Sequence, residues 1–370
     1  MTTTGTGSWR RLRLGTRGSR LALTQSGQVA EALRQAAAAG ALGEGSGGLD
    51  IELVTVRTDG DGDRTPLRQL GGVGVFAARL RHALLDGEVD LVVHSFKDLP
   101  TQPVEGLEVI CVPAREDPRD ALCARDGLTL ADLPEGARVG TGSPRRAAQL
   151  LAARPDLEVV DLRGNVPTRL ARVRGLEAVG VGTDEPVAPS RADAAGDLDA
   201  VVLALSGLRR LGLEHCASEV LDLETMLPAP AQGALAVEAR AGEDSAELAR
   251  AVAVLDDEPT RLAVTAERAL MARLGAGCAA PVGAWAHLRG GEQEQRVLVL
   301  RAVVTSLDGG QEVGCELSTE LPEASGVPGA PGDTAAVRAA EALGVRAAEV
   351  LLEDGADQIV DLHANKPRRD

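Results

Sequence analysis

A lysine beside an aspartate in the first third of the chain is the strongest chemical signal in the sequence. Lys97 and Asp98 come shortly after the apolar run Asp90–Val93, and Lys97 is one of only two lysines among 39 basic residues. A compact, titratable ammonium differs chemically from a planar guanidinium, so Lys97 is expected to do something that arginine cannot. Ligands bind beyond the carboxyl ends of strands in open α/β sheets, which places a site here. The alternative is a Lys–Asp pair that only solvates a turn.

Arginine-containing motifs supply a second kind of chemistry, the binding of acid groups. Gly142–Arg146 combines a glycine, a serine, a proline and two arginines at a predicted helix start. Free backbone N–H groups and guanidinium forks at such a position bind anions. Gly15–Ser19 and Leu162–Leu170 contain further arginines. For any single arginine the alternative is a solvated surface charge, so the prediction depends on the motifs being taken together.

Cys278 is the third candidate, in the small-residue segment Gly275–Pro281. A cysteine among small residues is more often a buried apolar side chain than a nucleophile. Here the composition predicts a tight loop that a bulky group could approach. The other four cysteines and the five histidines are scattered, without Cys-x-x-Cys spacing, so neither a disulfide framework nor a metal site is predicted.

Composition limits the class of protein. The 370 residues suggest two or three domains, and the net charge of −16 counts against nucleic-acid binding. Basic side chains that bind an acidic ligand must therefore be concentrated locally. No apolar run approaches the ~20 residues of a membrane span, and the first residues lack a signal-peptide pattern, so a cytoplasmic protein is expected.

The elements that must position these residues alternate between strands and helices, which is typical of a parallel α/β sheet. In the first part we expect strands at Leu12–Thr16, Ile51–Val56 and Val89–Val93, and helices from a Ser19 cap to about Ala38 and over Val75–Leu85. The polar, glycine-rich segment 59–74 is predicted to be a lid over the site, the alternative being a flexible surface loop.

Two further units follow. A second α/β unit begins near Arg119 and contains strands at Arg138–Gly140, Leu157–Leu162 and Ala200–Leu205, a helix over Arg145–Ala153 and an inserted loop at Leu176–Gly196. Pro228–Pro230 is a candidate hinge before a returning strand at Leu235–Glu238. The third unit contains helices at Thr260–Leu274 and Ala335–Leu352, and strands at Val282–His287, Arg296–Val304 and Gln311–Leu317. The predicted domains are residues 1–113 with 234–251, 119–227 and 256–370.

Six segments, in order, resemble the porphobilinogen deaminase (hydroxymethylbilane synthase) family over roughly residues 12 to 290. They are Gly15–Ser19, Val93–Pro100, Gly140–Arg146, Leu162–Leu170, Leu227–Gly233 and Gly275–Pro281. Ordered agreement of this kind is far more specific than one short motif. The resemblance implies an α/β fold with two similar domains like those of bilobal periplasmic binding proteins, plus a smaller C-terminal α+β domain.

The resemblance also implies an activity and its residues. The reaction is the stepwise condensation of four porphobilinogen molecules to hydroxymethylbilane with loss of ammonia, in haem biosynthesis. Asp98 would be the catalytic carboxylate, and Cys278 would hold a dipyrromethane cofactor through a thioether. The residues that would bind the cofactor and substrate are Arg17, Ser19, Ser95, Lys97, Ser143, Arg145, Arg146, Arg163, Arg169 and Arg210, the last preferred over Arg209. A monomer is expected, with at most transient contact with the next enzyme of the pathway.

Three departures from the family pattern concern the predicted lid and hinge. Val73 stands where the family usually has lysine, Arg79 stands where an acidic residue is expected, and Ala231 replaces a glycine, which is expected to stiffen the hinge. Two other interpretations are weighed: a bilobal anion-binding protein, which would need neither Asp98 nor Cys278, and an inactive paralogue.

Overall fold

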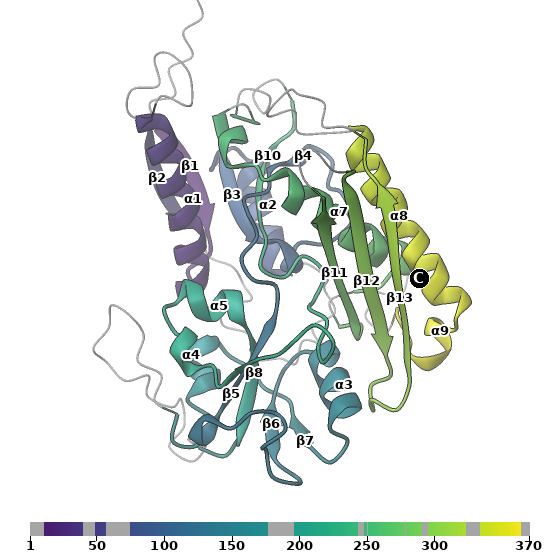
Figure 1. Ribbon diagram of the computed structural model, residues 1–370. Coiled ribbons are helices and arrows are strands. Elements are labelled where there is room, and N and C mark those ends of the chain that lie inside the picture. The colour runs from purple at the N-terminus through teal and green to yellow at the C-terminus, as the bar shows by residue number, and fades with distance from the viewer. Residues whose placement is uncertain are drawn as a thin grey trace, which may run out of the picture.

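The computed structural model describes residues 11–39, 49–56, 75–176, 196–242, 248–249, 251–277, 279–290, 295–322 and 334–363. Three sheets organise the chain. In Figure 1 the first lies at the top, the second at the bottom and the third at the right. No helix in the described part of the chain combines the length and apolar character needed to span a membrane.

The first sheet has the order β2-β1-β3-β10-β4 and is covered on both faces. Helix α1 packs on the face that carries Leu91 and Val93 of β3, and α2 packs on the face that carries Val92. β1, β2 and β3 are parallel, but β10 is antiparallel to both β3 and β4, so the sheet predicted to be parallel is mixed. Its elements are β1 (Arg11–Thr16), α1 (Arg20–Ala38), β2 (Asp50–Thr55), α2 (Val75–Leu85), β3 (Leu91–Ser95), β4 (Leu107–Cys111) and β10 (Leu235–Arg240).

The second sheet has the order β7-β6-β8-β5-β9 and repeats this architecture. β5 is antiparallel to β8 and β9, whereas β6 is parallel to β7 and β8. Its elements are β5 (Asp120–Ala124), η3 (Arg125–Gly127), β6 (Arg138–Gly140), α3 (Pro144–Ala153), β7 (Glu158–Val160), α4 (Val166–Leu170), β8 (Ala200–Ala204), α5 (Leu205–Arg210), η4 (Glu214–Cys216) and β9 (Glu219–Val220).

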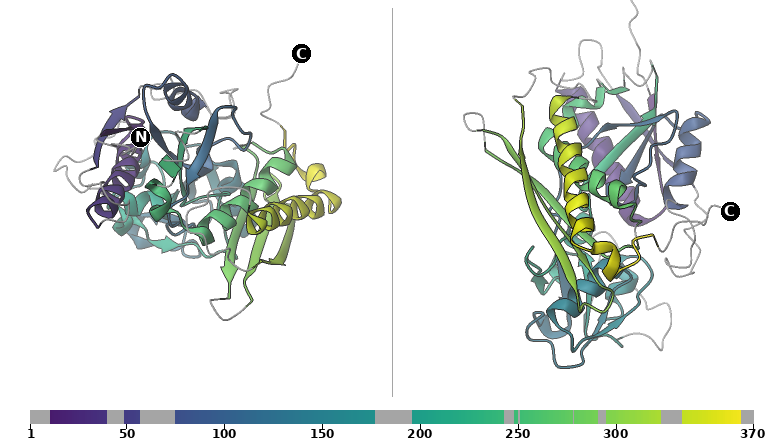
Figure 2. Two further views of the ribbon diagram at one scale, coloured as in Figure 1. Left: turned by 90° about the horizontal axis from the view of Figure 1, so that it is seen from above. Right: turned by 90° about the vertical axis from the view of Figure 1, so that its right-hand side faces the viewer.

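The third sheet is an antiparallel meander, β11-β12-β13, with α7 and α8 on one face. The right-hand view of Figure 2 shows α8 running alongside it. A side chain at Gly344 of α8 would lie 2.1 Å from the carbonyl oxygen of Ala266 in α7, so the two helices can approach this closely only with glycine there. The elements are η5 (Ala253–Leu255), α7 (Glu258–Leu274), β11 (Val282–Arg289), β12 (Val297–Thr305), β13 (Glu312–Glu320), α8 (Ala335–Glu353) and α9 (Ala356–Ile359).

Two crossing segments, residues 112–119 and 227–234, join the first two units, and Glu267 of α7 ties both to the third. The fully buried Glu267 carboxylate accepts hydrogen bonds from Arg115 Nη1 at 2.6 Å and from the backbone N–H of Ala231 at 2.6 Å. It also accepts from the N–H of Ala286 in β11 at 2.8 Å. One buried carboxylate therefore fixes both crossings against the third unit.

The predicted class, two α/β units followed by a smaller α+β unit, is confirmed. The helix at Val75–Leu85 and the Ser19 cap are also confirmed, but the strand predicted at Val89–Val93 lies at Leu91–Ser95. The shift arises because Val89 still bonds to the turn that ends α2. β4, β5, β9, α4 and α5 were not predicted. The predicted lid at 59–74, with Val73, and most of the 176–196 loop lie outside the described residues.

Candidate active site

The carboxyl end of β3 presents the Lys–Asp pair at the edge of the first sheet. A single 3-10 turn, η2 (Phe96–Asp98), follows the strand, with Phe96 buried in the core and Asp98 exposed. Lys97 is half-buried, and its Nζ donates a hydrogen bond to Oε1 of Gln232 at 3.2 Å. Ser95 precedes the turn and is also half-buried. The strand end therefore displays an exposed carboxylate next to a hydrogen-bonded ammonium.

Arg268, from α7 of the third unit, holds this turn in place. Its Nη1 donates to the carbonyl of Leu99 at 2.7 Å and its Nη2 to the carbonyl of Pro100 at 2.7 Å. Its guanidinium carbon also lies 4.4 Å from the ring centre of Phe96, which is cation–π geometry. Nothing in the α7 sequence distinguishes Arg268 from a surface arginine, so no local pattern predicts this contact.

Burial lowers the pKa of Lys97 to about 8. The carboxylates of Asp98 and Asp120 oppose this effect, whereas the guanidiniums of Arg145 and Arg146 reinforce it. Near neutral pH the ammonium is therefore still charged, but close to the pH at which it loses its proton. Such a balance needs a lysine, since a guanidinium does not titrate in this range.

A buried aspartate, Asp120, organises the arginine pair of the second unit. Arg145 Nη2 and Arg146 Nη2 each donate to a different oxygen of Asp120 at 2.7 Å, and all three side chains are buried. Burial alone would raise the pKa of Asp120, but the two guanidiniums hold it far below its usual range. Arg145 and Arg146, predicted to bind acid groups of a ligand, thus already share an internal counter-ion, and their role toward a ligand stays a prediction.

Gln232, on the second crossing segment, links this cluster to Lys97. Its Nε2 donates to Asp120 Oδ1 at 2.8 Å and to the carbonyl of Pro118 at 2.7 Å. Its Oε1 accepts from Lys97 and, at 3.4 Å, from Arg146 Nη2. The chain Lys97–Gln232–Asp120–Arg146 therefore runs from the first unit to the second across the crossing.

Arg163 and Arg169 approach the same region from the start and end of the α4 segment. Burial, together with the charges of Arg146 and Arg163, lowers the pKa of Arg169 to about 10, while Asp161 and Asp98 oppose that shift. Asp98 is thus within electrostatic range of Arg169, although they belong to different units. Arg163 Nε is buried and has no hydrogen-bond partner in the described structure.

The remaining predicted residues are Arg17, Ser19 and Ser143, and the two serines cap helices. The hydroxyl of Ser19 caps α1 by accepting from the N–H of Ala22 at 3.3 Å, and the adjoining Leu21 packs against the core beneath α5. Arg17 and Ser19 therefore lie at the boundary with the second unit. Ser143 similarly caps α3, accepting from the N–H of Arg146.

The two arginines that end α5 differ in their partners. Arg209 is exposed and its Nη1 donates to Glu116 Oε1 at 2.7 Å. Arg210 is half-buried, and its Nη2 donates to the carbonyl of Gly233, next to Gln232, at 2.7 Å. Arg210 therefore adjoins the Gln232 connection, and it stays the preferred candidate of the pair.

Cys278 itself lies outside the described residues. Helix α7 ends at Leu274 and is capped by Gly275, which has a left-handed φ of 63°. Ala280 N–H donates to the carbonyl of Gly277 at 3.0 Å. At a rise of 1.5 Å per residue, the end of α7 is about 10 Å along the helix axis from Arg268, which binds the Asp98 turn. The segment predicted to carry the cofactor thus begins about two turns of α7 beyond the residue that binds the Asp98 turn.

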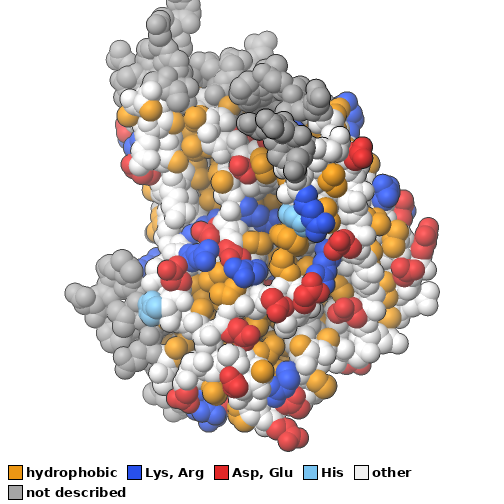
Figure 3. Space-filling view, viewed as in Figure 1, with side chains coloured by type: hydrophobic (Ala, Val, Ile, Leu, Met, Phe, Trp, Pro, Cys, Tyr) orange, Lys and Arg blue, Asp and Glu red, His pale blue; other side chains and the backbone are white. Residues whose placement is uncertain are grey.

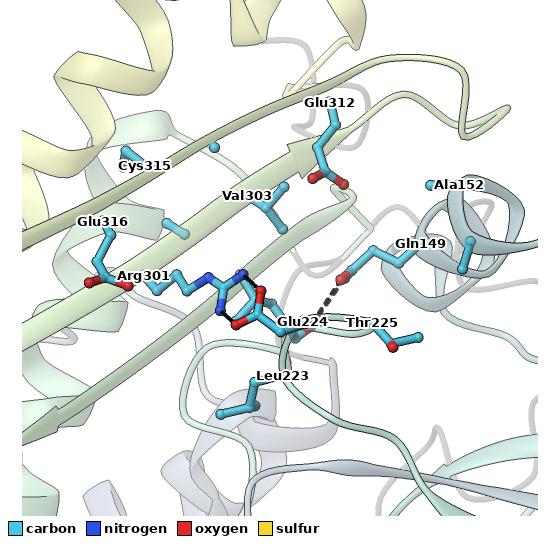
Figure 4. Close-up of a pocket in the computed structure, with 14 residues that line it drawn as sticks. Gln149, Ala152, Leu223, Glu224, Thr225, Arg301, Val303, Glu312, Cys315 and Glu316 are labelled. Atoms are coloured by element: carbon cyan, nitrogen blue, oxygen red, sulfur yellow. Dashed lines mark hydrogen bonds and ion pairs between the residues drawn. The ribbon is translucent and has the colours of Figure 1, made fainter.

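Charged side chains of both signs lie at the waist between the first and second units. Figure 3 shows Lys and Arg side chains there, with Asp and Glu side chains among them. A cavity of about 620 Å³ lies elsewhere, between α3 and the β12–β13 strands, and contains none of the predicted residues. Figure 4 shows Arg301 and Glu224 paired across it, with Gln149 beyond. That ion pair joins the second and third units, so the cavity lies at the interface between these two units.

Sequence reasoning missed Asp120, Gln232, Arg268 and Glu267. Asp120 did carry a signal, because a charged residue that opens an otherwise apolar strand is buried and must be paired. Gln232 belonged to a recognised motif but was not assigned a role. The other two reveal their function only through contacts with distant backbone groups, which no local pattern encodes.

Comparison with known proteins gives a consistent result. Residues 12–248 match the family model described as porphobilinogen deaminase, dipyromethane cofactor binding domain, and residues 261–353 match the porphobilinogen deaminase C-terminal domain. The porphobilinogen deaminase of Cutibacterium acnes is 53% identical over 97% of this chain and 99% of its own length. That of Micrococcus luteus is 51% identical over 97% and 98%. Among solved structures, a TRAP periplasmic solute-binding protein from Bordetella is similar over 65% of this chain and 78% of its own, with 13% identity and a TM-score of 0.33.

Proposed function

The chain belongs to the porphobilinogen deaminase family, and we propose that Asp98 and the residues around it carry out the family's reaction. The protein is a transferase of tetrapyrrole biosynthesis, and residues 12–248 form the family's cofactor-binding region. The reaction that we assign is the condensation of four porphobilinogen molecules to hydroxymethylbilane with release of four molecules of ammonia. The observation that carries this assignment is the exposed Asp98 carboxylate, which interacts with the half-buried ammonium of Lys97 and with Arg169 of the arginine cluster.

The proposed cofactor is dipyrromethane, attached to Cys278 by a thioether. Two buried guanidinium nitrogens, Arg145 Nε and Arg163 Nε, lack hydrogen-bond partners in the described structure. The acetate and propionate groups of a dipyrromethane are acceptors of the kind that such donors need. When bound, dipyrromethane supplies the free pyrrole α-carbon on which the chain grows. The residues proposed to hold it are Arg17, Ser19, Ser95, Lys97, Ser143, Arg145, Arg146, Arg163, Arg169 and Arg210.

Asp98 is proposed to act on the charge that develops during each condensation. Its carboxylate stabilises the cation formed when the protonated amino group departs as ammonia and the methylene carbon stays on the pyrrole. After the free α-carbon of the growing chain has attacked that methylene, Asp98 accepts the α-proton that the attacked ring must lose. Lys97 and Arg169 are the positively charged side chains that interact electrostatically with Asp98. We also propose that the protein acts as a cytoplasmic monomer, with at most transient contact with the next enzyme.

The test is turnover by the purified protein. Porphobilinogen consumption and ammonia release are measured together, and one tetrapyrrole is expected for every four ammonia molecules. Asp98→Asn should lower kcat by at least about 100-fold, the range of lost acid–base catalysis. Asp161→Asn, which removes another carboxylate acting on Arg169, should keep kcat within a few-fold. A protein that binds porphobilinogen but releases no ammonia would instead favour the anion-binding interpretation.

A further inference from the structure

Three buried polar side chains in the first unit lie behind the candidate site and take no part in the proposed reaction. Arg81 of α2 donates from Nε at 3.0 Å and from Nη2 at 2.8 Å to Glu238 Oε1 on β10. His94 of β3 lies with Nε2 3.1 Å from Glu238 Oε2. The three residues are only 9%, 2% and 7% exposed. One carboxylate therefore connects a helix and two strands inside the core.

The chemistry of this trio indicates a positional role. Burial raises the pKa of Glu238, but the hydrogen bonds from His94 and Arg81 outweigh that effect, so the carboxylate is ionised. Buried ion pairs add little net stability compared with apolar side chains of similar volume, because the desolvation of both charges offsets their attraction. What such a pair does provide is a fixed relative position for the elements that carry it. Here those elements are α2, β3 and β10.

The part of β3 that needs fixing is the part that leads to Asp98. β3 pairs with β1 only at Leu91 and Val92, whereas its pairing with β10 continues to Ser95. Beyond Val92, therefore, β3 is paired with β10 on one side but not with β1 on the other in the described structure. His94 lies within this one-sided stretch, and its side chain reaches diagonally to Glu238, which is opposite Val92.

We propose that Arg81, Glu238 and His94 form a buried clamp that positions the carboxyl end of β3, and through it the Lys97–Asp98 turn. Arg81 and His94 are positioning residues, since neither belongs to the predicted binding set. The inference rests on the proposed function for its kinetic consequence. A small displacement of Asp98 would lower kcat, while the arginines of the second unit would still bind the substrate.

The test compares Arg81→Met with Arg13→Met in the full-length protein. Arg13 pairs with Asp90 at 2.7 Å at the amino end of the same strand, so its loss perturbs the same sheet away from the site. We expect Arg81→Met to lower kcat by about 10- to 100-fold, the effect of a misplacement on the order of 1 Å, with KM within about twofold. Arg81→Lys should recover part of the loss, and Arg13→Met should keep its kcat.

A second readout does not depend on turnover. The chain has only two lysines, so lysine-labelled protein gives two side-chain NMR signals, and that of Lys97 should shift in Arg81→Met but not in Arg13→Met. If Arg81→Met does not fold, Glu238→Gln, which keeps the shape and removes the charge, serves in its place. Unchanged kcat and an unchanged Lys97 signal would overturn the clamp, as would equal losses in the Arg13 control. A wild-type protein without turnover would count against the proposed function. The Lys97 signal would still show whether Arg81, Glu238 and His94 position the Lys97–Asp98 turn.

Discussion

The titration of Lys97 is a direct consequence of its surroundings. Its ordinary pKa of 10.5 falls to about 8 because the ammonium is buried. At 1.36 kcal/mol per pH unit, the folded protein disfavours the charged form by about 3 kcal/mol. Between about pH 8 and 10.5 the unfolded chain keeps a proton that the folded chain has released. The contribution of Lys97 to the free energy of unfolding should therefore rise with pH across this interval.

Lysine NMR measures this pKa directly, because Lys366 is the only other lysine. The Cys278→Ser protein, which should carry no cofactor, is labelled with 13C,15N-lysine and titrated from pH 6 to 11, and Lys97→Arg assigns the signals. We expect the Lys97 Cε signal to titrate near pH 8. Asp98→Asn should move that pKa lower still, since the Asp98 carboxylate favours the ammonium.

Two results would refute this reasoning. If the Lys97 Cε signal shows that the side chain stays protonated to about pH 10, then the ammonium is solvated and burial does not set its pKa. A pKa that rises in Asp98→Asn would mean that the two side chains do not interact as the structure places them. Either result would remove the electrostatic argument that Lys97 acts beside Asp98.

Four further predictions concern stability and binding. Asp120→Asn should lower the free energy of unfolding by about 3–5 kcal/mol in denaturant titrations, because two buried guanidiniums lose their counter-ion; a cost below 1 kcal/mol would contradict it. Ala231→Gly should change stability by less than about 1 kcal/mol, since relief of its left-handed φ of 62° is offset by lost methyl burial and gained chain entropy. Gly233→Ala should unfold at a clearly lower denaturant concentration than the wild-type protein, because the new Cβ would lie 2.3 Å from the carbonyl oxygen of Glu116. Arg210→Ala should raise KM for porphobilinogen about 10-fold or more, as loss of a charged hydrogen bond does, while Arg209→Ala should not.

Much of the fold could be predicted because its signals are local. The helix over Val75–Leu85 contains neither proline nor glycine, and Ser19 precedes α1 as a helix cap should. β5 (Asp120–Ala124) was missed because it is short and opens with a charged residue that is buried only through its partners. The antiparallel entry of β10 into the first sheet depends on the crossing segments, which local patterns do not encode.

The site could be predicted as a set of residues but not as a network. Motif arginines such as Arg145 were expected to be available to a ligand, whereas Asp120 already binds their guanidiniums. The stiffening expected at Ala231 stays a prediction: the residue has a left-handed φ, and its backbone N–H donates to Glu267. Such pairings join residues far apart in the chain, and only the three-dimensional structure brings them together.

The intact mass of the purified protein, measured beside that of Cys278→Ser, tests the central claim most directly. A covalent dipyrromethane predicts a mass above that of the sequence by two pyrrole units in the wild-type protein and none in the variant. If the wild-type protein shows only its sequence mass, even after incubation with porphobilinogen, then Cys278 holds no cofactor and the proposed reaction is contradicted.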